Sequence, residues 1–252
     1  MKLKDKVAIV TGASSGMGRA IAHRFVREGA AVVLCGRDRR KGESALEEIT
    51  ADGGEARLVC GNVAEPEVNR ELVRTAAGDF GGIDVLVPNA GLLGLGSVTG
   101  VDWDTWHETI NVNLNGVFYL LRYGIPELQK RANGSIVVTG SIAAYKGFPN
   151  HAAYCASKGA LVPFIKQVAV DYGPEIRANI ICPGPVDTPL IWDSAAAFPD
   201  PEKAVSDVAE KTLLKRLGTP KDIADLALFL AAGESSWITG AAFTIDGGVT
   251  CL

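Results

Sequence analysis

Cysteine and histidine are scarce in this sequence, and neither is grouped. The five cysteines are odd in number, are widely separated and form no Cys-x-x-Cys; they are Cys35, Cys60, Cys155, Cys182 and Cys251. The three histidines are equally isolated and show no metal-ligand spacing. This pattern excludes a disulfide-stapled secreted domain and a zinc module. It predicts free thiols in a reducing cytoplasm and no catalytic metal.

Long apolar runs and an excess of positive charge are also missing. The basic N-terminal residues precede only Val7 to Val10, which is too short for the apolar region of a signal peptide. No apolar run approaches the roughly 20 residues of a membrane span. The net charge of −4 and the pI of about 5.5 give no basic field for nucleic acid or an anionic membrane. We therefore expect a cytoplasmic protein that binds neither.

Apolar, strand-like runs alternate with helical segments along the whole chain. Strands are predicted at 7–10, 31–35, 56–60, 83–87, 135–139, 178–182 and 242–245, and helices between them include 39–51, 66–80 and 105–129. This alternation is the βαβ pattern of a parallel sheet with helices on both faces. A length of 252 residues, without a linker or internal repeat, favours one α/β domain over 1–252.

A glycine-rich loop joins the first predicted strand to a helix. It reads Thr11-Gly12-Ala13-Ser14-Ser15-Gly16-Met17-Gly18. Strand, glycine loop and helix in this order form the setting that dinucleotide binding requires. The glycines allow a tight turn, close approach to a pyrophosphate and packing of helix on strand, and the helix N-terminus offers free N–H groups to the phosphates. Three glycines in an ordinary loop are the alternative.

The second predicted strand ends in a basic residue, where proteins that bind NAD have an acid for the ribose 2′-hydroxyl. Here Gly36 leaves room, and the guanidinium of Arg37 suits a 2′-phosphate. Asp38 lies two positions past the strand tip and is predicted to cap the next helix. We interpret the pattern as a preference for NADP(H). A solvated basic corner is the alternative.

The stretch from Ser141 to Lys158 carries the candidate chemistry. Ser141 follows a predicted strand, and Tyr154 and Lys158 lie four residues apart on a predicted helix, which puts phenol and ammonium on one face. A free tyrosine has a pKa of about 10, so Tyr154 acts near neutral pH only if its phenolate is stabilised by about 4 kcal/mol. Taken alone, this spacing also fits a surface Tyr–Lys pair. Asn113, if it faces inward, can hold a water near Lys158.

Together these motifs resemble the short-chain dehydrogenase/reductase family over essentially the whole chain. The matching residues are Thr11-Gly12-x-x-x-Gly16-x-Gly18, Asn89-Ala90-Gly91, Asn113, Ser141, Tyr154-x-x-x-Lys158, Asn179, Pro183-Gly184 and Asp246-Gly247-Gly248. The chain departs from the family at Pro88, where many members have a first asparagine. It departs again at Asn62, where an aspartate usually faces adenine, so we expect weaker adenine affinity.

The resemblance implies a Rossmann-type, doubly wound three-layer sandwich with a seven-stranded parallel sheet, and usually a homotetramer. It implies that Tyr154 exchanges the proton and that Ser141 orients the substrate oxygen. Lys158 would bind the nicotinamide ribose and lower the Tyr154 pKa, while Asn113 anchors a water relay. The residues expected to bind NADP(H) are Gly12, Ser14, Ser15, Gly16, Met17, Gly18, Arg37, Asn62, Val63, Asn89, Ala90, Gly91, Tyr154, Lys158, Pro183, Gly184, Val186 and Thr188.

The segment 188–215 is weakly patterned and is expected to form a substrate lid; an ordinary surface excursion is the alternative. The residues expected to line the substrate site are Ser141, Leu93, Leu95, Phe148, His151, Leu190, Ile191, Trp192 and Phe198. Because most of them are apolar, we expect an uncharged, apolar or aromatic ketone or secondary alcohol as substrate.

These features predict an NADPH-dependent oxidoreductase that interconverts a ketone and a secondary alcohol. A 3-oxoacyl-(acyl-carrier-protein) reductase is an alternative, although the acidic stretch from Asp171 to Glu175 would not attract an acidic carrier. A steroid or sugar-alcohol dehydrogenase is also open. From another class, a non-catalytic NADP(H)-binding regulator would not need all of Asn113, Ser141, Tyr154 and Lys158.

Overall fold

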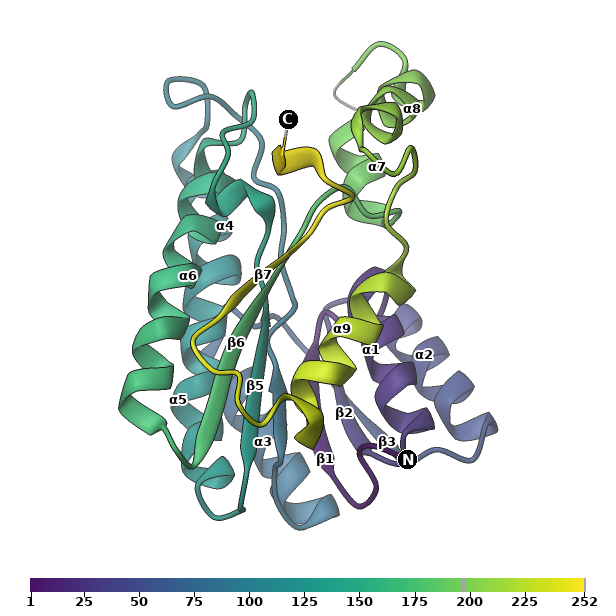
Figure 1. Ribbon diagram of the computed structural model, residues 1–252, viewed down its shortest axis with the longest axis vertical. Helices are drawn as coiled ribbons and strands as arrows, with labels where there is room; N and C mark the ends of the chain where they lie inside the picture. The colour runs from purple at the N-terminus through teal and green to yellow at the C-terminus, as the bar shows by residue number, and fades with distance from the viewer. Residues whose placement is uncertain (196–197, 252) are drawn as a thin grey trace.

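A twisted parallel sheet runs through the computed structural model, which describes residues 1–195 and 198–251 (Figure 1). Its strands are β1 (Val7–Thr11), β2 (Ala31–Gly36), β3 (Ala56–Cys60), β4 (Val85–Val87), β5 (Gly134–Thr139), β6 (Ile176–Pro183) and β7 (Ala242–Ile245). They lie in the order β3-β2-β1-β4-β5-β6-β7, and each neighbouring pair is parallel. The predicted seven-stranded, doubly wound sheet is confirmed.

Helices cover both faces of this sheet and make the molecule three layers thick (Figure 1). One face carries α1 (Gly16–Arg27), α2 (Arg39–Ala51) and α9 (Pro220–Ala231). The other carries α3 (Pro66–Phe80), α4 (Trp103–Ile110), α5 (Gly116–Leu128) and α6 (Ala152–Tyr172). Two further helices, α7 (Pro189–Ala195) and α8 (Pro201–Lys211), stand beyond the carboxyl ends of the strands.

Each face of the sheet has its own apolar core. In β1, Ala8 and Val10 pack in the core under α1 and α9, whereas Val7 and Ile9 pack in the core under α3 and α5. All five residues of β1 are buried. Because both faces of a parallel sheet are covered, such strands read as continuous apolar runs, which is why the sequence located them well.

The long helix predicted over 105–129 is present, but it is not α-helical throughout. Between α4 and α5 lies a five-residue π-helical turn, Asn111–Asn115. Asn113 lies within this turn, is completely buried and makes its side-chain hydrogen bonds to groups outside the helix. These inward bonds hold the widened turn in place, and π turns of this kind are frequent at functional sites.

Other element boundaries differ from the prediction by one or two residues. The strand predicted at 83–87 spans Val85–Val87, and the one predicted at 178–182 spans Ile176–Pro183. The predicted lid, 188–215, contains α7 and α8, and residues 196–197 within it lie outside the described residues. Across the described ranges, no helix combines the length and the apolar character needed to cross a bilayer.

Candidate active site

The predicted site residues gather at the carboxyl edge of the sheet. The glycine loop follows β1, Asn89 follows β4, Ser141 follows β5 and Gly184 follows β6. Parallel strands bring these positions to one edge, and the strand order reverses there between β1 and β4. In doubly wound sheets, this edge is where the ligand crevice forms.

The loop after β1 fits a dinucleotide pyrophosphate. Gly12 and Gly16 have positive φ angles of 65° and 51°, which only glycine adopts readily. Ser15 is the N-cap of α1, and within the described part of the chain its side chain makes no capping bond and the first helical turn has no acid. The first N–H groups of α1 are therefore left for an anion.

Asn89 uses its side chain to tie together the ends of β1, β4 and β5. Its Nδ2 donates to the Thr11 carbonyl at 2.9 Å, and its Oδ1 accepts from Thr139 Oγ1 at 3.0 Å. Gly18 packs against this amide, since an added Cβ would lie 2.5 Å from Asn89 Nδ2. The predicted close packing of α1 at Gly18 is thus observed. It depends on Asn89, a residue that the sequence analysis assigned to cofactor binding.

Ser141 and Tyr154 lie together at the entrance of α6. The Ser141 hydroxyl accepts a hydrogen bond from the Ala143 N–H at 3.1 Å. Burial raises the pKa of Tyr154, and the hydrogen bond with Ser141 offsets only part of this effect. The sequence predicted a lowered pKa. The structure gives the opposite direction, because burial of the phenol outweighs the groups that favour its ionised form.

Lys158 is almost completely buried, at 4% exposure. Its Nζ donates to the Thr139 carbonyl at 2.9 Å and lies 5.9 Å from the centre of the Tyr154 ring. Burial lowers the pKa of Lys158 to about 8, although the nearby Cys182 thiol acts in the opposite direction. Tyr154 and Lys158 therefore share one face of α6, as predicted. The Lys158 ammonium loses its proton more easily than that of an exposed lysine.

Asn113 joins the π turn to two other parts of the site. Its amide donates to the Leu92 carbonyl at 2.9 Å and to Ser157 Oγ at 3.0 Å, and its Oδ1 accepts from the Leu92 N–H at 2.9 Å. Ser157 in turn donates to the Tyr154 carbonyl at 2.8 Å. Sequence reasoning missed Ser157. Its position directly before Lys158, inside the Tyr-x-x-x-Lys motif, was the available signal.

Gly91 keeps the space between Asn113 and Lys158 open. A Cβ added to Gly91 would lie 3.3 Å from Asn113 Oδ1 and 3.5 Å from Lys158 Nζ. These two polar atoms therefore face one small volume beside the end of β4. A side chain at position 91 would fill it.

At the tip of β2, Asp38 caps α2, accepting a hydrogen bond from the Lys41 N–H at 3.1 Å as predicted. Arg37 is 58% exposed and pairs with Glu108 of α4 at 3.3 Å. The room expected beside Gly36 is bordered by Ser14, because an added Cβ would lie 2.8 Å from Ser14 Oγ. A serine hydroxyl and a guanidinium thus lie at this corner, and both can donate to a phosphate.

At the tip of β3 are Asn62 and Val63, both predicted to contact the cofactor. Asn62 Oδ1 accepts a hydrogen bond from the Ala64 N–H at 3.1 Å, which closes a local turn. Val63 is buried in the core, and its carbonyl accepts from Asn69 at 2.8 Å.

The segment after β6 touches the glycine loop. A Cβ on Gly16 would lie 3.2 Å from Thr188 Cγ2, and Thr188 Oγ1 donates to the Val186 carbonyl at 3.2 Å. Gly184 packs against Asp246, since a Cβ there would lie 2.6 Å from the Asp246 Cα. The Pro183-Gly184 turn therefore packs against the Asp246-Gly247-Gly248 segment.

Among the predicted substrate residues, the structure brings Phe148 and His151 close to Tyr154. The centroid of the His151 ring lies 6.1 Å from that of the Tyr154 ring and 6.0 Å from that of the Phe148 ring. His151 Nδ1 lies 2.6 Å from the Pro149 carbonyl, which can only accept, so this nitrogen carries a proton. A bridge between His151 and Gly96 brings the loop that carries Leu93 and Leu95 alongside.

The lid residues are more open. Leu190 and Ile191 on α7 are partly buried. Trp192 is 42% exposed and donates its indole N–H to Asp187 at 2.9 Å, and Phe198 is 57% exposed. None of these four side chains is packed in the core.

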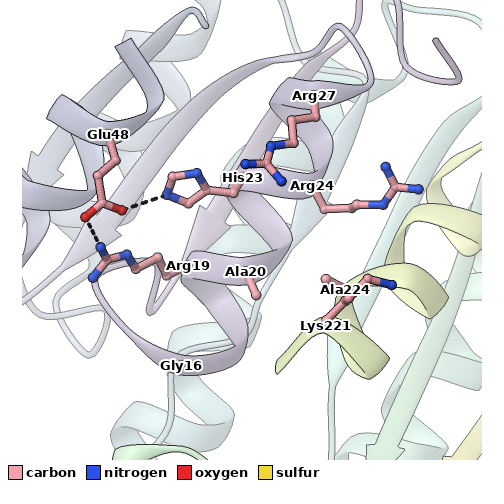
Figure 2. A pocket seen from close by; sticks show the side chains of 9 residues that line it. All are labelled: Gly16, Arg19, Ala20, His23, Arg24, Arg27, Glu48, Lys221 and Ala224. Carbon is pink, nitrogen blue, oxygen red and sulfur yellow. Dashed lines mark hydrogen bonds and ion pairs between the residues drawn. The ribbon is translucent and has the colours of Figure 1, made fainter. Parts of the chain in front are cut away.

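A groove of about 490 Å³ lies away from this site, between α1, α2 and α9 (Figure 2). Figure 2 shows Arg19 and His23 directed toward Glu48 on one side of the groove, with Arg24 and Lys221 on the other. Arg24 pairs with Glu28 at 2.8 Å, and Arg19 pairs with Glu48. Of its lining residues, only Gly16 belongs to the predicted site.

Comparison with known proteins gives matches over almost the whole chain. A family model described as enoyl-(acyl carrier protein) reductase matches residues 12–250. An NADP-dependent (R)-specific alcohol dehydrogenase from Lentilactobacillus kefiri is 38% identical over 255 residues, which cover 99% of this chain and 98% of the relative. A 3-oxoacyl-(acyl-carrier-protein) reductase from Thermotoga maritima is 35% identical over 250 residues, which cover 99% of each.

A solved structure agrees with these matches. Levodione reductase superposes with a TM-score of 0.95 at 29% identity, covering 99% of each chain. The names of these three proteins describe different substrates at similar levels of identity. The similarity therefore specifies the architecture and the reaction type more closely than the substrate.

Proposed function

This chain belongs to the short-chain dehydrogenase/reductase family, and we propose that it is an NADP(H)-dependent oxidoreductase that interconverts a ketone and a secondary alcohol. Its membership in a family of oxidoreductases that act on alcohols and ketones is the premise. The observation that carries the proposal is the convergence of Ser141, Tyr154 and Lys158 at the edge where the glycine loop opens α1.

Tyr154 is placed to exchange a proton with the substrate oxygen. Its raised pKa keeps the neutral phenol predominant near neutral pH, and this is the form that protonates a carbonyl oxygen during reduction. The Ser141 hydroxyl beside it would hold the same oxygen. A bound nicotinamide cofactor supplies or accepts the hydride. In alcohol oxidation the phenol must first lose its proton, which becomes easier as the pH rises.

Lys158 would stabilise the charge that develops on the phenol oxygen. Its ammonium is nearly buried and fixed by the Thr139 carbonyl, so it needs little reorganisation when the proton leaves Tyr154. The same ammonium would bind the nicotinamide ribose. The polar space that Gly91 leaves between Asn113 and Lys158 is where a water could relay the proton outward.

The preference for NADP(H) rests on the tip of β2. Asp38, the nearby acid that could bind a 2′-hydroxyl, is engaged in capping α2, whereas Arg37 and Ser14 offer donors. We expect Arg37→Ala to weaken NADPH binding by about 1–3 kcal/mol, the value of a charge-assisted contact, and to leave NADH little changed. An equal loss for both nucleotides would show that Arg37 is structural.

The substrate is proposed to be uncharged and largely apolar or aromatic. Phe148, Leu190 and Ile191 offer apolar surface around the site, and His151 offers a polar edge near Tyr154. A 3-oxoacyl-(acyl-carrier-protein) reductase would have the same scaffold, but the segment from Asp171 to Glu175 at the end of α6 is acidic. An acidic carrier would be repelled there.

A homotetramer is the expected assembly on the family resemblance. Exposed apolar side chains on the outer helices, Phe118 of α5 and Val170 of α6, are compatible with self-association. Analytical ultracentrifugation should give a tetramer, and a monomer at micromolar concentration would contradict this proposal.

The test of the proposed function follows absorbance at 340 nm with NADPH or NADH and a panel of apolar ketones, aldehydes and short 3-oxoacyl thioesters. We expect turnover of apolar ketones with NADPH preferred. Preferential turnover of the thioesters would favour the carrier reductase reading. Tight NADPH binding without turnover anywhere on the panel would favour a nucleotide-binding regulator and would count against an oxidoreductase of ketones.

A further inference from the structure

An ion pair joins two elements on either side of the expected adenosine position. Arg37, at the tip of β2, and Glu108, on α4, are 71 residues apart in sequence, and their charged groups lie 3.3 Å apart. Nearby, the Cys60 thiol donates to the Arg37 carbonyl at 3.5 Å. A Cβ on Gly116, at the start of α5, would lie 2.9 Å from Val63. The Arg37–Glu108 pair therefore completes a ring of contacts around the end of β3.

The pair is well suited to being opened. Its side chains are 58% and 54% exposed. Exposed ion pairs contribute little to stability, because water screens them and two long side chains must be held in place. The neighbouring Asp38 does not compete with Glu108 for Arg37, because the Asp38 carboxylate caps α2. Glu108 is thus the carboxylate that holds this guanidinium, at modest strength.

We propose that Glu108 weakens the preference for NADPH, by competing with the ribose 2′-phosphate for Arg37. This inference rests on the proposed use of NADP(H) and deepens it. A 2′-phosphate carries up to two negative charges and would have to displace the Glu108 carboxylate or tolerate it nearby. The 2′-hydroxyl of NADH is uncharged and can donate to a carboxylate. Glu108 therefore acts against NADPH and not against NADH.

The corner then contains two opposing determinants. Arg37 favours NADPH and Glu108 reduces that advantage, so the wild-type protein should discriminate between the nucleotides less than its arginine alone would suggest. Both residues act on the ribose end of the nucleotide, far from Tyr154. Changes at Glu108 should therefore alter nucleotide affinity and leave the proton chemistry unaffected.

The test measures the Kd of NADPH and NADH by nucleotide fluorescence for wild type, Glu108→Gln, Arg37→Ala and the double variant. Asp104→Asn is the matched control, because it removes one negative charge from the same helix. We expect Glu108→Gln to bind NADPH about 3–10-fold more tightly, and NADH equally or up to about threefold more weakly. Asp104→Asn should change both by less than about twofold. Circular dichroism and thermal melting would check that each variant is folded.

Competition for one guanidinium also makes the two residues non-additive. At least half of the gain in NADPH affinity, on a logarithmic scale, should disappear when Arg37 is already alanine. Equal changes for NADPH and NADH in Glu108→Gln, or a gain no larger than that of Asp104→Asn, would overturn the inference and leave the NADP(H) proposal standing. If Arg37→Ala weakened both nucleotides equally, the NADP(H) proposal itself would fail, and the role of Glu108 with it.

Discussion

Two groups of basic side chains in this protein lie in opposite surroundings. In the candidate active site, Lys158 is 4% exposed, and its Nζ donates to the Thr139 carbonyl. Across the described residues, Lys158 forms no ion pair with a carboxylate, and Cys182 is the one group whose charge acts on its pKa. Along the groove of Figure 2, Arg19 and Arg24 face solvent at about one-third exposure, and each is paired with a carboxylate.

The buried ammonium can stabilise a charge that develops in the active site, whereas the exposed guanidinium groups only form surface ion pairs. A buried ammonium without a carboxylate partner weakens the folded state, because its ionised form has lost its water. Exposed ion pairs change stability little in either direction. Replacing the buried lysine should therefore change stability more than a substitution in the groove. At the active site, activity should fall while stability rises.

The largest expected effect is that of Tyr154→Phe. Removing the phenol hydroxyl should lower kcat about 1,000-fold, because the proton donor is lost, and should leave the Kd of NADPH within about twofold. Tyr172→Phe, on the same helix but at its far end, is the control and should keep kcat within about twofold. Steady-state kinetics and nucleotide titration measure both. Retention of most of the activity by Tyr154→Phe would refute the proton role.

Lys158→Met should lose activity and gain stability in the nucleotide-free protein. A fall of the Lys158 pKa from 10.5 to about 8 corresponds to about 3 kcal/mol against folding when the side chain is charged. Since methionine also loses the bond to Thr139, we expect a gain of about 1–3 kcal/mol at pH 7 in urea unfolding. A destabilised variant would show that the ammonium contributes to the fold.

The pH profile provides an independent test of the same lysine. Below pH 8 the folded protein keeps Lys158 charged, and its cost to stability is fully present. Between about 8 and 10.5 the unfolded chain binds more protons than the folded one, so this cost disappears and the lysine's contribution to stability becomes less unfavourable as the pH rises.

In the same range, kcat/KM for NADPH should fall about tenfold per pH unit above pH 8, because the free enzyme loses the ammonium. A flat kcat/KM up to pH 10 would contradict the lowered pKa. Urea unfolding of wild type and Lys158→Met at pH 7 and pH 10 should show that their difference in stability shrinks.

The smallest effect is expected in the groove. Glu48→Gln removes the carboxylate that pairs with Arg19 and lies 3.3 Å from His23. We expect the free energy of unfolding to change by less than about 1 kcal/mol, and the difference to shrink in 0.5 M NaCl, because such pairs are screened. Activity should be unchanged. A loss above about 2 kcal/mol, or weaker NADPH binding, would mean that this surface is coupled to Gly16 and the nucleotide loop.

Much of the fold was predictable because its signals are local. Apolar strands buried on both faces, the glycine loop and the Asp38 cap each depend on a few neighbouring residues, and the structure confirms them. The alternation of strand and helix then leaves few topologies, since parallel crossovers share one hand. The shared carboxyl edge that gathers Ser141 and Tyr154 follows from that topology.

What sequence reasoning missed depends on distant contacts. The direction of the Tyr154 pKa follows from burial by surrounding segments, which no motif encodes. The side chain of Asn89 is held by Thr11 and Thr139, which lie 78 and 50 residues away. Likewise, the Arg37 motif revealed nothing of Glu108, because only the folded chain brings α4 beside the tip of β2.

The π turn at Asn111–Asn115 makes this part of the chain sensitive to length. A π turn is equivalent to one extra residue inserted in an α-helix, and the wider turn absorbs the rotation of about 100° that this residue would otherwise cause. Deleting a single residue here would allow α4 and α5 to join as one regular helix. The faces of α4 and α5 would keep their relative direction, but Asn113 would lose the position in the wide turn from which it bonds to Leu92. Substitutions should be tolerated here more readily than a change in length, and relatives without the extra residue should align with a one-residue gap.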